Sequence, residues 1–258
     1  MIKTKFQTRR AILAIVIILG IISCKTTLFI HDIKMENIPN NENISTIDSS
    51  IILLVAPYQT ELKEDMYEII GTSDAELVKG KPESLLTNYL SDLLLDEGDK
   101  LAEKYTQKPY PDLAYLNYGG IRTALPKGPI TVGKIYELMP FENELVLLKI
   151  GGEQLYEFAE QIARQQGDCV SGIRLEIRDG VITRFDVNGK PVNRSASYWM
   201  ITNEYVANGG DQMNMLLKRK EYIQLNMKIR DCFINRMRKD YQEGKVISPK
   251  LDGRIRYE

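Results

Sequence analysis

The 258-residue sequence has little histidine, little cysteine and no excess of charge of either sign. His31 is its one histidine, there are three cysteines, and 34 basic against 35 acidic residues leave a formal net charge of −1. Balanced charge does not favour a nucleic-acid binder or an acidic tail, so we expect no nucleic-acid partner. The sequence also has no phosphate-binding loop ending in Gly-Lys-Ser/Thr and no pairing of a nucleophile with a base. We therefore assign no catalytic residue.

The first 48 residues are typical of an export signal followed by a tether. Four basic side chains within residues 1–10 precede an uncharged apolar run from Ala11 to Ser23, which has the length of a signal-peptide core and is too short to span a bilayer comfortably. The run ends in Ile21-Ile22-Ser23-Cys24, which resembles a bacterial lipobox. We therefore expect a lipoprotein signal peptide at 1–23, a lipid on Cys24 and a polar, Asn-rich tether at 24–48.

This interpretation predicts an exported protein that is lipid-anchored to a bacterial membrane and faces the periplasm. The alternative is a plain N-terminal membrane anchor with a chance cysteine. If Cys24 carries a lipid, Cys169 and Cys232 are the remaining cysteines. In an exported protein these two can form one disulfide or stay as buried free thiols, and their spacing does not decide between the two.

Helical and strand-like patterns alternate from residue 49 to the C-terminus. Apolar residues at helical spacing predict helices at 51–70 with a break or kink at Pro57, at 84–103 with Ser84 as cap, and at 134–138, 152–164 and 223–241. Strand patterns occupy 113–116, 144–150, 173–177, 181–187 and 198–202, and Asp179-Gly180 predicts a tight turn in a hairpin. Mixed elements with helices at both ends predict one α+β domain over 49–258, a single layered structure of mixed sheet and helices.

Two strand ends are followed by similar polar turns. These are Asn117-Tyr118-Gly119-Gly120-Ile121-Arg122 and, after the last strand, Asn208-Gly209-Gly210-Asp211. Glycine pairs let the backbone approach a ligand and leave N–H groups free to donate. Arg122 can hold an anion with two parallel hydrogen bonds, and Asp211 can accept from vicinal hydroxyls. Taken singly, each feature also suits an ordinary turn or helix cap.

Two aromatic residues complete a set that fits a nucleotide. Phe141 lies in Pro140-Phe141-Glu142-Asn143, and Tyr205 lies just before the second turn. Aromatic faces on two different loops can sandwich a flat base. A lone Phe after Pro is more often a core residue, but an anion site, a diol site and two aromatic faces together describe a nucleotide.

Three linked motifs resemble one known family. Asn-x-Gly-Gly-Ile-Arg, Pro-Phe-x-Asn and Ala-Asn-Gly-Gly-Asp, in this order and at these separations, are similar to the C-terminal domain of the 5′-nucleotidase family over roughly residues 51–256. The resemblance implies that domain's fold and its role as the substrate-specificity domain. The substrate-binding residues that we take from it are Asn117, Gly119, Gly120, Arg122, Phe141, Asn143, Tyr205, Asn208, Asp211 and Lys81.

The resemblance also implies a role for each group. The base would stack between Phe141 and Tyr205, Asn117 and Asp211 would hold the ribose, and Arg122 would bind the phosphate. The two remaining asparagines lie inside the motifs and would shape the loops or touch the base.

Several positions depart from the family pattern. Tyr205 stands in place of the usual Phe, which keeps the stacking face, and Tyr118 stands where many members have a third Gly. Lys81 occupies the region of a further arginine, and Thr87 takes a Gly position. Because lysine lacks the planar fork of arginine, we expect a weaker grip on phosphate.

The largest departure concerns metal ligands. Full-length family members carry a two-metal phosphoesterase domain before this one, and such a centre needs several Asp, Asn and His ligands. The one histidine of this sequence is His31, which lies within the expected tether. We therefore expect no cofactor in this chain, divalent metal ions in a separate metallophosphoesterase partner, and no hydrolysis by this chain alone.

The function hypothesis that follows is nucleotide recognition within a split 5′-nucleotidase. One alternative is a non-catalytic, lipid-anchored nucleoside or nucleotide-binding protein. Another is a structural lipoprotein built on a retired enzyme fold.

Overall fold

The computed structural model describes residues 49–106 and 110–258. The expected signal peptide, Cys24, the tether and His31 lie outside the described residues. Leu53–Glu258 form one compact unit, and the described part of the other unit, Met1–Ile52, is the start of a helix. Within the described ranges no helix is both long enough and apolar enough to cross a membrane.

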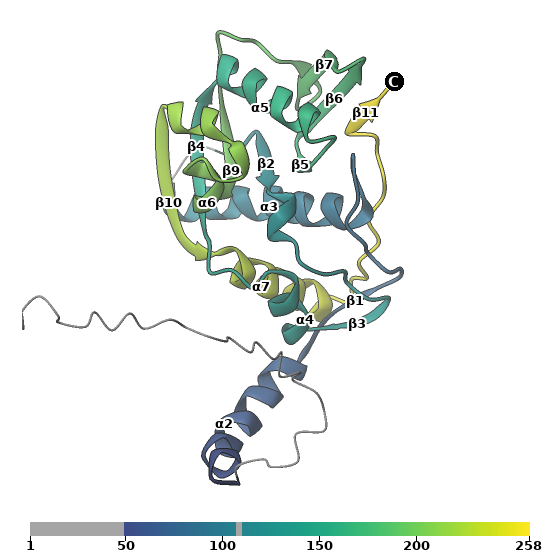
Figure 1. Cartoon of the computed structure of the whole chain (residues 1–258), viewed down its shortest axis with the longest axis vertical. Helices are drawn as coiled ribbons and strands as arrows, with labels where there is room; N and C mark the ends of the chain where they lie inside the picture. The colour runs from purple at the N-terminus through teal and green to yellow at the C-terminus, as the bar shows by residue number, and fades with distance from the viewer. Residues whose placement is uncertain (1–48, 107–109) are drawn as a thin grey trace, which may run out of the picture. The chain divides into compact units, whose positions relative to one another are not determined.

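Helices and strands alternate along the chain (Figure 1). The helices are α2 (Ser49–Tyr67), α3 (Leu85–Thr106), α4 (Val132–Leu138), α5 (Gly152–Arg164), α6 (Glu204–Ala207) and α7 (Ile229–Gln242). Short 3-10 turns occupy Tyr118–Gly120, Gly210–Gln212 and Asn214–Lys218. The strands are β1 (Ile69–Ser73), β2 (Leu113–Leu116), β3 (Gly128–Thr131), β4 (Glu144–Gly151), β5 (Cys169–Ser171), β6 (Ile173–Arg178), β7 (Val181–Val187), β8 (Lys190–Pro191), β9 (Ser197–Asn203), β10 (Glu221–Lys228) and β11 (Ile255–Tyr257).

A five-stranded sheet in the order β10-β4-β9-β2-β5 forms the centre of the domain. β2 and β9 are parallel neighbours, whereas β4 runs antiparallel to both β9 and β10, and β5 runs antiparallel to β2. Two smaller sheets, β1-β3 and β11-β6-β7-β8, complete the strand pairing. The central sheet is therefore mixed, as predicted for an α+β domain.

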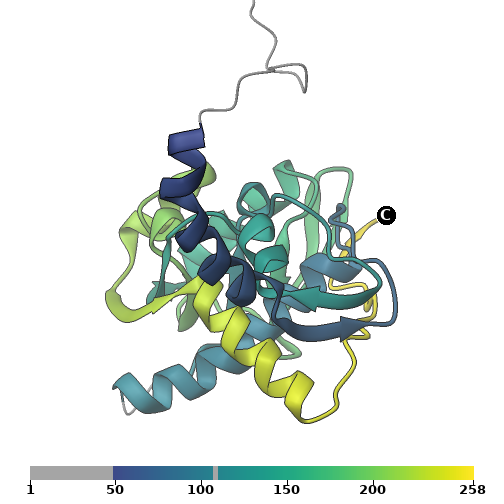
Figure 2. The ribbon, with the colours of Figure 1, turned by 90° about the horizontal axis from the view of Figure 1, so that it is seen from below.

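Both faces of the central sheet are buried. Along β4, Leu145 and Leu147 belong to one hydrophobic cluster and Val146 and Leu148 to the other, because successive side chains point to opposite faces of a strand. α3, α4 and α7 cover the first face, and α5 with β6 and β7 covers the second. α7 lies beside both α3 and β1 (Figures 1 and 2).

The local signals in the sequence are mostly confirmed. β2 and α5 have the predicted bounds. The helix predicted over 51–70 continues through Pro57 and ends at Tyr67, and strand β1 begins at Ile69. Ser84 caps α3 as predicted: its hydroxyl accepts from the Thr87 N–H (3.1 Å), and Thr87 Oγ1 accepts from the Ser84 N–H (2.8 Å). The hairpin turn has positive φ at both Asp179 and Gly180.

The long helix predicted over 223–241 is wrong in its first part. Residues 221–228 form strand β10, which pairs with β4 at the edge of the central sheet, and the helix begins at Ile229. Ile223, Leu225 and Met227 all face the first core, so the alternation of period two is present in the sequence. Residues 221–224 and Lys228 pair with β4, and this pairing, together with burial of one face against the core, outweighed the local helical pattern.

The two remaining cysteines are buried free thiols and form no disulfide with each other. Cys169 and Cys232 are free and buried. Burial raises the pKa of both thiols, so they stay protonated and unreactive near neutral pH.

Arg254 joins the C-terminal segment to the body of the domain. Its side chain is only 8% exposed. The guanidinium donates to both carboxylate oxygens of Asp92 in α3 (2.7 and 2.9 Å), to Asp252 (3.0 and 2.9 Å) and to the Val170 carbonyl of β5 (2.9 Å). One buried side chain therefore connects three separate segments.

Arg254→Met should lower the free energy of unfolding by about 2 kcal/mol, because methionine fills similar space but donates none of these charge-assisted bonds. Chemical denaturation followed by circular dichroism measures the change. Arg256→Met, at an exposed position two residues further along, is the matched control and should have little effect. A similar loss in both variants would contradict the assigned role of Arg254.

Candidate functional site

One cavity collects most of the residues that the sequence singled out. Its volume is about 360 Å³, and it is lined by Asn117, Gly119, Gly120, Arg122, Phe141, Asn143, Tyr205 and Asp211. All eight were predicted from the sequence to bind substrate. They come from three loops that are far apart in the chain.

Sheet topology explains why the three loops meet. β2 and β9 are parallel neighbours, so the Asn117 loop and the Tyr205 loop leave the sheet at the same edge. β4 runs antiparallel to β9, with Leu145 opposite Asn203, so the loop that enters β4 lies at that edge too. This loop carries Phe141.

The two aromatic rings keep exposed faces. Phe141 is 45% exposed and Tyr205 is 47% exposed, although side chains of this size usually bury most of their area. Both line the same cavity from different loops. The arrangement leaves apolar faces available to a flat ligand.

A chain of hydrogen bonds orients the polar groups of the cavity. Asn203 Nδ2 donates to Asn117 Oδ1 (3.2 Å), and Asn117 Nδ2 donates to Asp211 Oδ2 (2.7 Å). The Tyr205 hydroxyl donates to the other oxygen of Asp211 (3.0 Å). A carboxylate has about four acceptor sites, so Asp211 can still accept from ligand hydroxyls. The hydroxyl in which Tyr205 differs from phenylalanine thus holds the ring and the carboxylate together.

Close packing disfavours a side chain at two glycine positions. A Cβ on Gly120 would lie 3.0 Å from Asn117 Oδ1, and a Cβ on Gly210 would lie 2.5 Å from the Tyr205 ring. A side chain at either position would therefore press on a cavity residue. The Gly120 N–H donates to the Asn117 carbonyl (2.9 Å), so this amide, contrary to expectation, is used inside the turn.

The Phe141 loop is fastened to the start of α7. The Asn143 carbonyl accepts from the Ile229 N–H (3.0 Å). The Glu142 carboxylate accepts from Lys228 and Arg230, and these hydrogen bonds lower the pKa of Glu142 to about 2. The residue between Phe141 and Asn143 is therefore held by a charged clamp, which limits the movement of both neighbours.

Three cationic side chains surround the first turn. Arg122 lines the cavity, and Lys79 donates to the Ile121 carbonyl (2.6 Å). The ammonium groups of Lys79 and Lys81 lie 4.3 and 5.0 Å from the centre of the Tyr118 ring. Burial and the nearby charges of Arg122 and Lys81 lower the pKa of Lys79. An anion bound here would relieve this repulsion.

Two of the predicted residues do not line the cavity. Lys81 is exposed and donates to the Gln165 carbonyl. Asn208 ends α6, and its side-chain oxygen accepts from Arg219 Nη2 (3.3 Å). Both lie beside the residues that do line it, Lys81 next to Tyr118 and Asn208 at the end of the helix that carries Tyr205.

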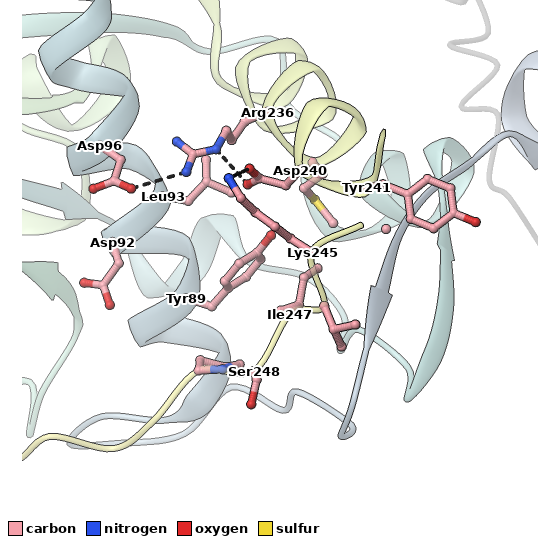
Figure 3. Close-up of a pocket in the computed structure, with 14 residues that line it drawn as sticks. Tyr89, Asp92, Leu93, Asp96, Arg236, Asp240, Tyr241, Lys245, Ile247 and Ser248 are labelled. Atoms are coloured by element: carbon pink, nitrogen blue, oxygen red, sulfur yellow. Dashed lines mark hydrogen bonds and ion pairs between the residues drawn. The ribbon is translucent and has the colours of Figure 1, made fainter. Parts of the chain in front are cut away.

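A second cavity differs in its electrostatics (Figure 3). It holds about 250 Å³ and is lined by α3, α7 and the segment 245–249. There Arg236 contacts Asp240 (2.7 Å) and Asp96 (3.4 Å), and Lys245 reaches the same Asp240 (2.9 Å). Those charges neutralise one another, whereas no carboxylate among the described residues pairs with Arg122.

A buried carboxylate supports the first turn from below. Asp168 accepts from the backbone N–H groups of Tyr118 and Cys169 (both 2.8 Å) and from the Tyr115 hydroxyl (3.1 Å). Burial raises the pKa of Asp168 to about 6, and the hydrogen bonds offset part of that rise. The charge of the Asp168 carboxyl, and with it the hydrogen bonding beneath the first turn, therefore changes as the pH passes through about 6.

In the part of the chain that the structure covers, no group of three or more His, Cys, Asp or Glu side chains is arranged to hold a metal ion. The cavity described above is lined by amide, carboxylate, guanidinium and aromatic groups.

Comparison with known proteins identifies the family. Residues 69–218, more than half of the chain, match the family described as 5′-nucleotidase, C-terminal domain. The chain belongs to this family. The match confirms the resemblance carried by the three motifs.

Relatives of this 5′-nucleotidase C-terminal domain are much longer proteins. The trifunctional nucleotide phosphoesterase protein YfkN of Bacillus subtilis is 26% identical over 77% of this chain and 14% of its own length. Protein UshA of Escherichia coli is 23% identical over 75% of this chain and 35% of its own length. The chain thus spans about a third or less of these relatives.

A solved structure supports the same fold. The 5′-nucleotidase precursor from Thermus thermophilus superposes with a TM-score of 0.67 at 26% identity, covering 81% of this chain and 43% of that one. The predicted α+β fold of the 5′-nucleotidase C-terminal domain is confirmed.

Sequence reasoning missed three residues that shape the site of this 5′-nucleotidase domain. Lys79 stands two residues before Lys81, which was predicted to bind substrate, so the positive charge of Lys79 was a usable signal. Asn203 ends β9, and a polar residue at the end of a strand two positions before Tyr205 was the available signal. Asp168 gave no signal, because only the fold brings it beneath Tyr118.

Asp168→Asn should remove one pH dependence of stability. Asp168 titrates near 6 in the folded domain against 3.8 for the ordinary carboxyl, so the folded state binds this proton more tightly than the unfolded state. The stabilisation is present below pH 3.8 and is lost as the pH rises through 6, by up to about 3 kcal/mol. Asparagine keeps an acceptor for the two amides but does not titrate.

Denaturation midpoints measured from pH 3.5 to 7 for both proteins test this. The difference in free energy of unfolding between wild type and variant should change in favour of the variant as the pH rises. Curves that stay parallel over this range would refute the assignment.

Proposed function

We propose that this chain is the nucleotide-recognition part of a split 5′-nucleotidase, which takes part in nucleotide hydrolysis together with a separate metallophosphoesterase. The observation that carries the proposal is the cavity of about 360 Å³, in which a single space is lined by two open aromatic faces, one oriented carboxylate and one arginine that no carboxylate of residues 49–106 or 110–258 pairs with. Base, diol and phosphate are the three groups of a nucleotide that these side chains suit.

The base would lie between Phe141 and Tyr205. Stacking tolerates any base because every base has a flat π face, so the rings supply affinity rather than base selection. Asn143 lines the same cavity and offers an amide donor and acceptor to the edge of the base.

The sugar and phosphate would extend toward the first turn. Asp211 is an acceptor only, which suits two neighbouring hydroxyl donors. Arg122 can give two parallel N–H bonds to a phosphate, and Lys79 adds a second positive charge on the same side. Burial of Lys79 and the repulsion among the cations favour a dianion at this position.

In this proposal the metal chemistry belongs to the partner. Divalent ions there would polarise the phosphate ester and supply the attacking hydroxide, while this chain holds the nucleoside. The chain would be exported and held to a bacterial membrane through a lipid on Cys24, facing the periplasm. Partner and substrate would then meet at the membrane surface.

A second candidate is a non-catalytic nucleotide-binding protein. It is favoured by the lining of the cavity, which combines groups suited to base, sugar and phosphate within this one chain. The two candidates differ in whether a partner enzyme hydrolyses the bound nucleotide.

Arg122→Ala should weaken AMP binding by roughly 10- to 100-fold, the value of losing charge-assisted bonds, while adenosine binding changes little. Isothermal calorimetry with both ligands measures the difference. Lys190→Ala, an exposed cation on β8, is the charge-matched control. Equal losses for AMP and adenosine would remove Arg122 from the phosphate role.

Tyr205→Ala should weaken adenosine and AMP alike, by about tenfold or more, because it removes one stacking face. Tyr205→Phe keeps the ring and loses only the hydrogen bond to Asp211, so its effect should be a few-fold. The same calorimetry distinguishes them. If the phenylalanine variant is as weak as the alanine variant, the hydroxyl and not the ring carries the interaction.

Mixing the purified chain with candidate metallophosphoesterases should accelerate phosphate release from AMP in the presence of divalent metal. The Arg122→Ala chain should give little of this acceleration, which makes it the matched control. AMP binding without acceleration by any partner would favour the non-catalytic candidate. Phosphate release by the pure chain with metal would contradict the division of labour.

A further inference from the structure

The amino-terminal half of α2 exposes a run of large apolar side chains. Ile51 is 58% exposed, Leu53 75%, Leu54 70% and Tyr58 66%. Contiguous apolar surface of this kind is rare on proteins that contact only water and marks an interaction site. This run lies outside the nucleotide cavity and has no role in the proposed recognition.

The exposed side chains point to all sides of the helix. Each residue of an α-helix is rotated by about 100° from the one before it, which gives 3.6 residues per turn. The four consecutive residues from Ile51 to Leu54 therefore point to all sides of the helix. A groove or a second helix would cover one side only. A medium that surrounds the helix end would cover all of them.

The polarity of the side chains changes from one end of the helix to the other. Residues 49–60 carry no charged side chain, whereas Lys63, Glu64 and Asp65 follow in the second half. Met66, near the end of α2, packs against the first core of the domain. The charged end is therefore the attached end, and the apolar end is the one directed away from that attachment.

We propose that residues 51–58 of α2 enter the head-group region of a lipid bilayer. Eight helical residues span about 12 Å, well under the roughly 30 Å of a bilayer's hydrocarbon core, so this segment can enter one surface of the bilayer without crossing it. The expected lipid on Cys24 lies 25 residues before Ser49 in the sequence and would keep the helix end near that surface. The inference rests on the proposed anchor for this proximity and is independent of the nucleotide cavity.

The apolar end of α2 would hold the domain close to the bilayer rather than at the full reach of its tether.

A tryptophan scan of the full chain in vesicles tests the proposal. Trp199 is the one tryptophan, so Trp199→Phe provides a silent background for Leu54→Trp. The controls are Lys63→Trp, in the charged half of the same helix, and Leu217→Trp, an apolar position elsewhere that is 54% exposed. Each protein is reconstituted into phosphatidylethanolamine–phosphatidylglycerol vesicles, with or without brominated acyl chains.

Leu54→Trp should emit at shorter wavelength, be quenched by the brominated lipids and be shielded from aqueous iodide several-fold better than either control. Iodide quenching equal to that of Leu217→Trp would place the helix end in water and overturn the proposal. Shielding from both quenchers would mean that protein covers it, a second copy or another partner, and would overturn it too. AMP binding, measured on the same variants, reports separately on the nucleotide cavity.

Discussion

The parallel pairing of β2 with β9 is the constraint on which the candidate site depends. It brings the carboxyl ends of two strands, some ninety residues apart in the chain, to one edge of the central sheet. The antiparallel β4 then delivers its incoming loop to the same edge. Because one face of this sheet is buried under helices and the other under α5 with β6 and β7, its register cannot slip without moving core side chains to the wrong face. The positions of the site loops are thus set by core packing.

Polar groups beneath and within the site carry the local precision. Asp168 is a buried carboxylate, which is costly unless hydrogen bonds compensate, and three donors hold it under the first turn. Above it, Asn203, Asn117, Asp211 and Tyr205 form one chain of hydrogen bonds. Side chains linked in this way lose little further freedom on binding a ligand, so the site is organised before the ligand arrives.

Charge is distributed unevenly over the domain. Most cations found elsewhere, such as Arg254, Arg236 and Arg238, are paired with carboxylates. At the first turn Arg122, Lys79 and Lys81 gather without such pairing among the described residues. A family assignment shows the fold, whereas function resides in the site, and it is this unpaired positive charge beside two open aromatic rings that supports nucleotide recognition. The proposed membrane contact of α2 is a separate matter, because it rests on exposed apolar side chains outside the cavity.

The sequence alone determined the fold class, the family, most helices, the longer strands other than β10, and eight residues of one cavity, because glycine turns, caps and apolar periodicity are local signals. It misjudged residues 223–228, which were predicted as helix and pair with β4 as a strand, and residues 69–70, which belong to β1. Only the tertiary structure decided that Asp168 lies beneath Tyr118, that Lys79 joins Arg122, and that Lys81 and Asn208 stand beside the cavity rather than in its wall. These relations depend on contacts between distant segments, and such contacts leave no periodic trace in the sequence.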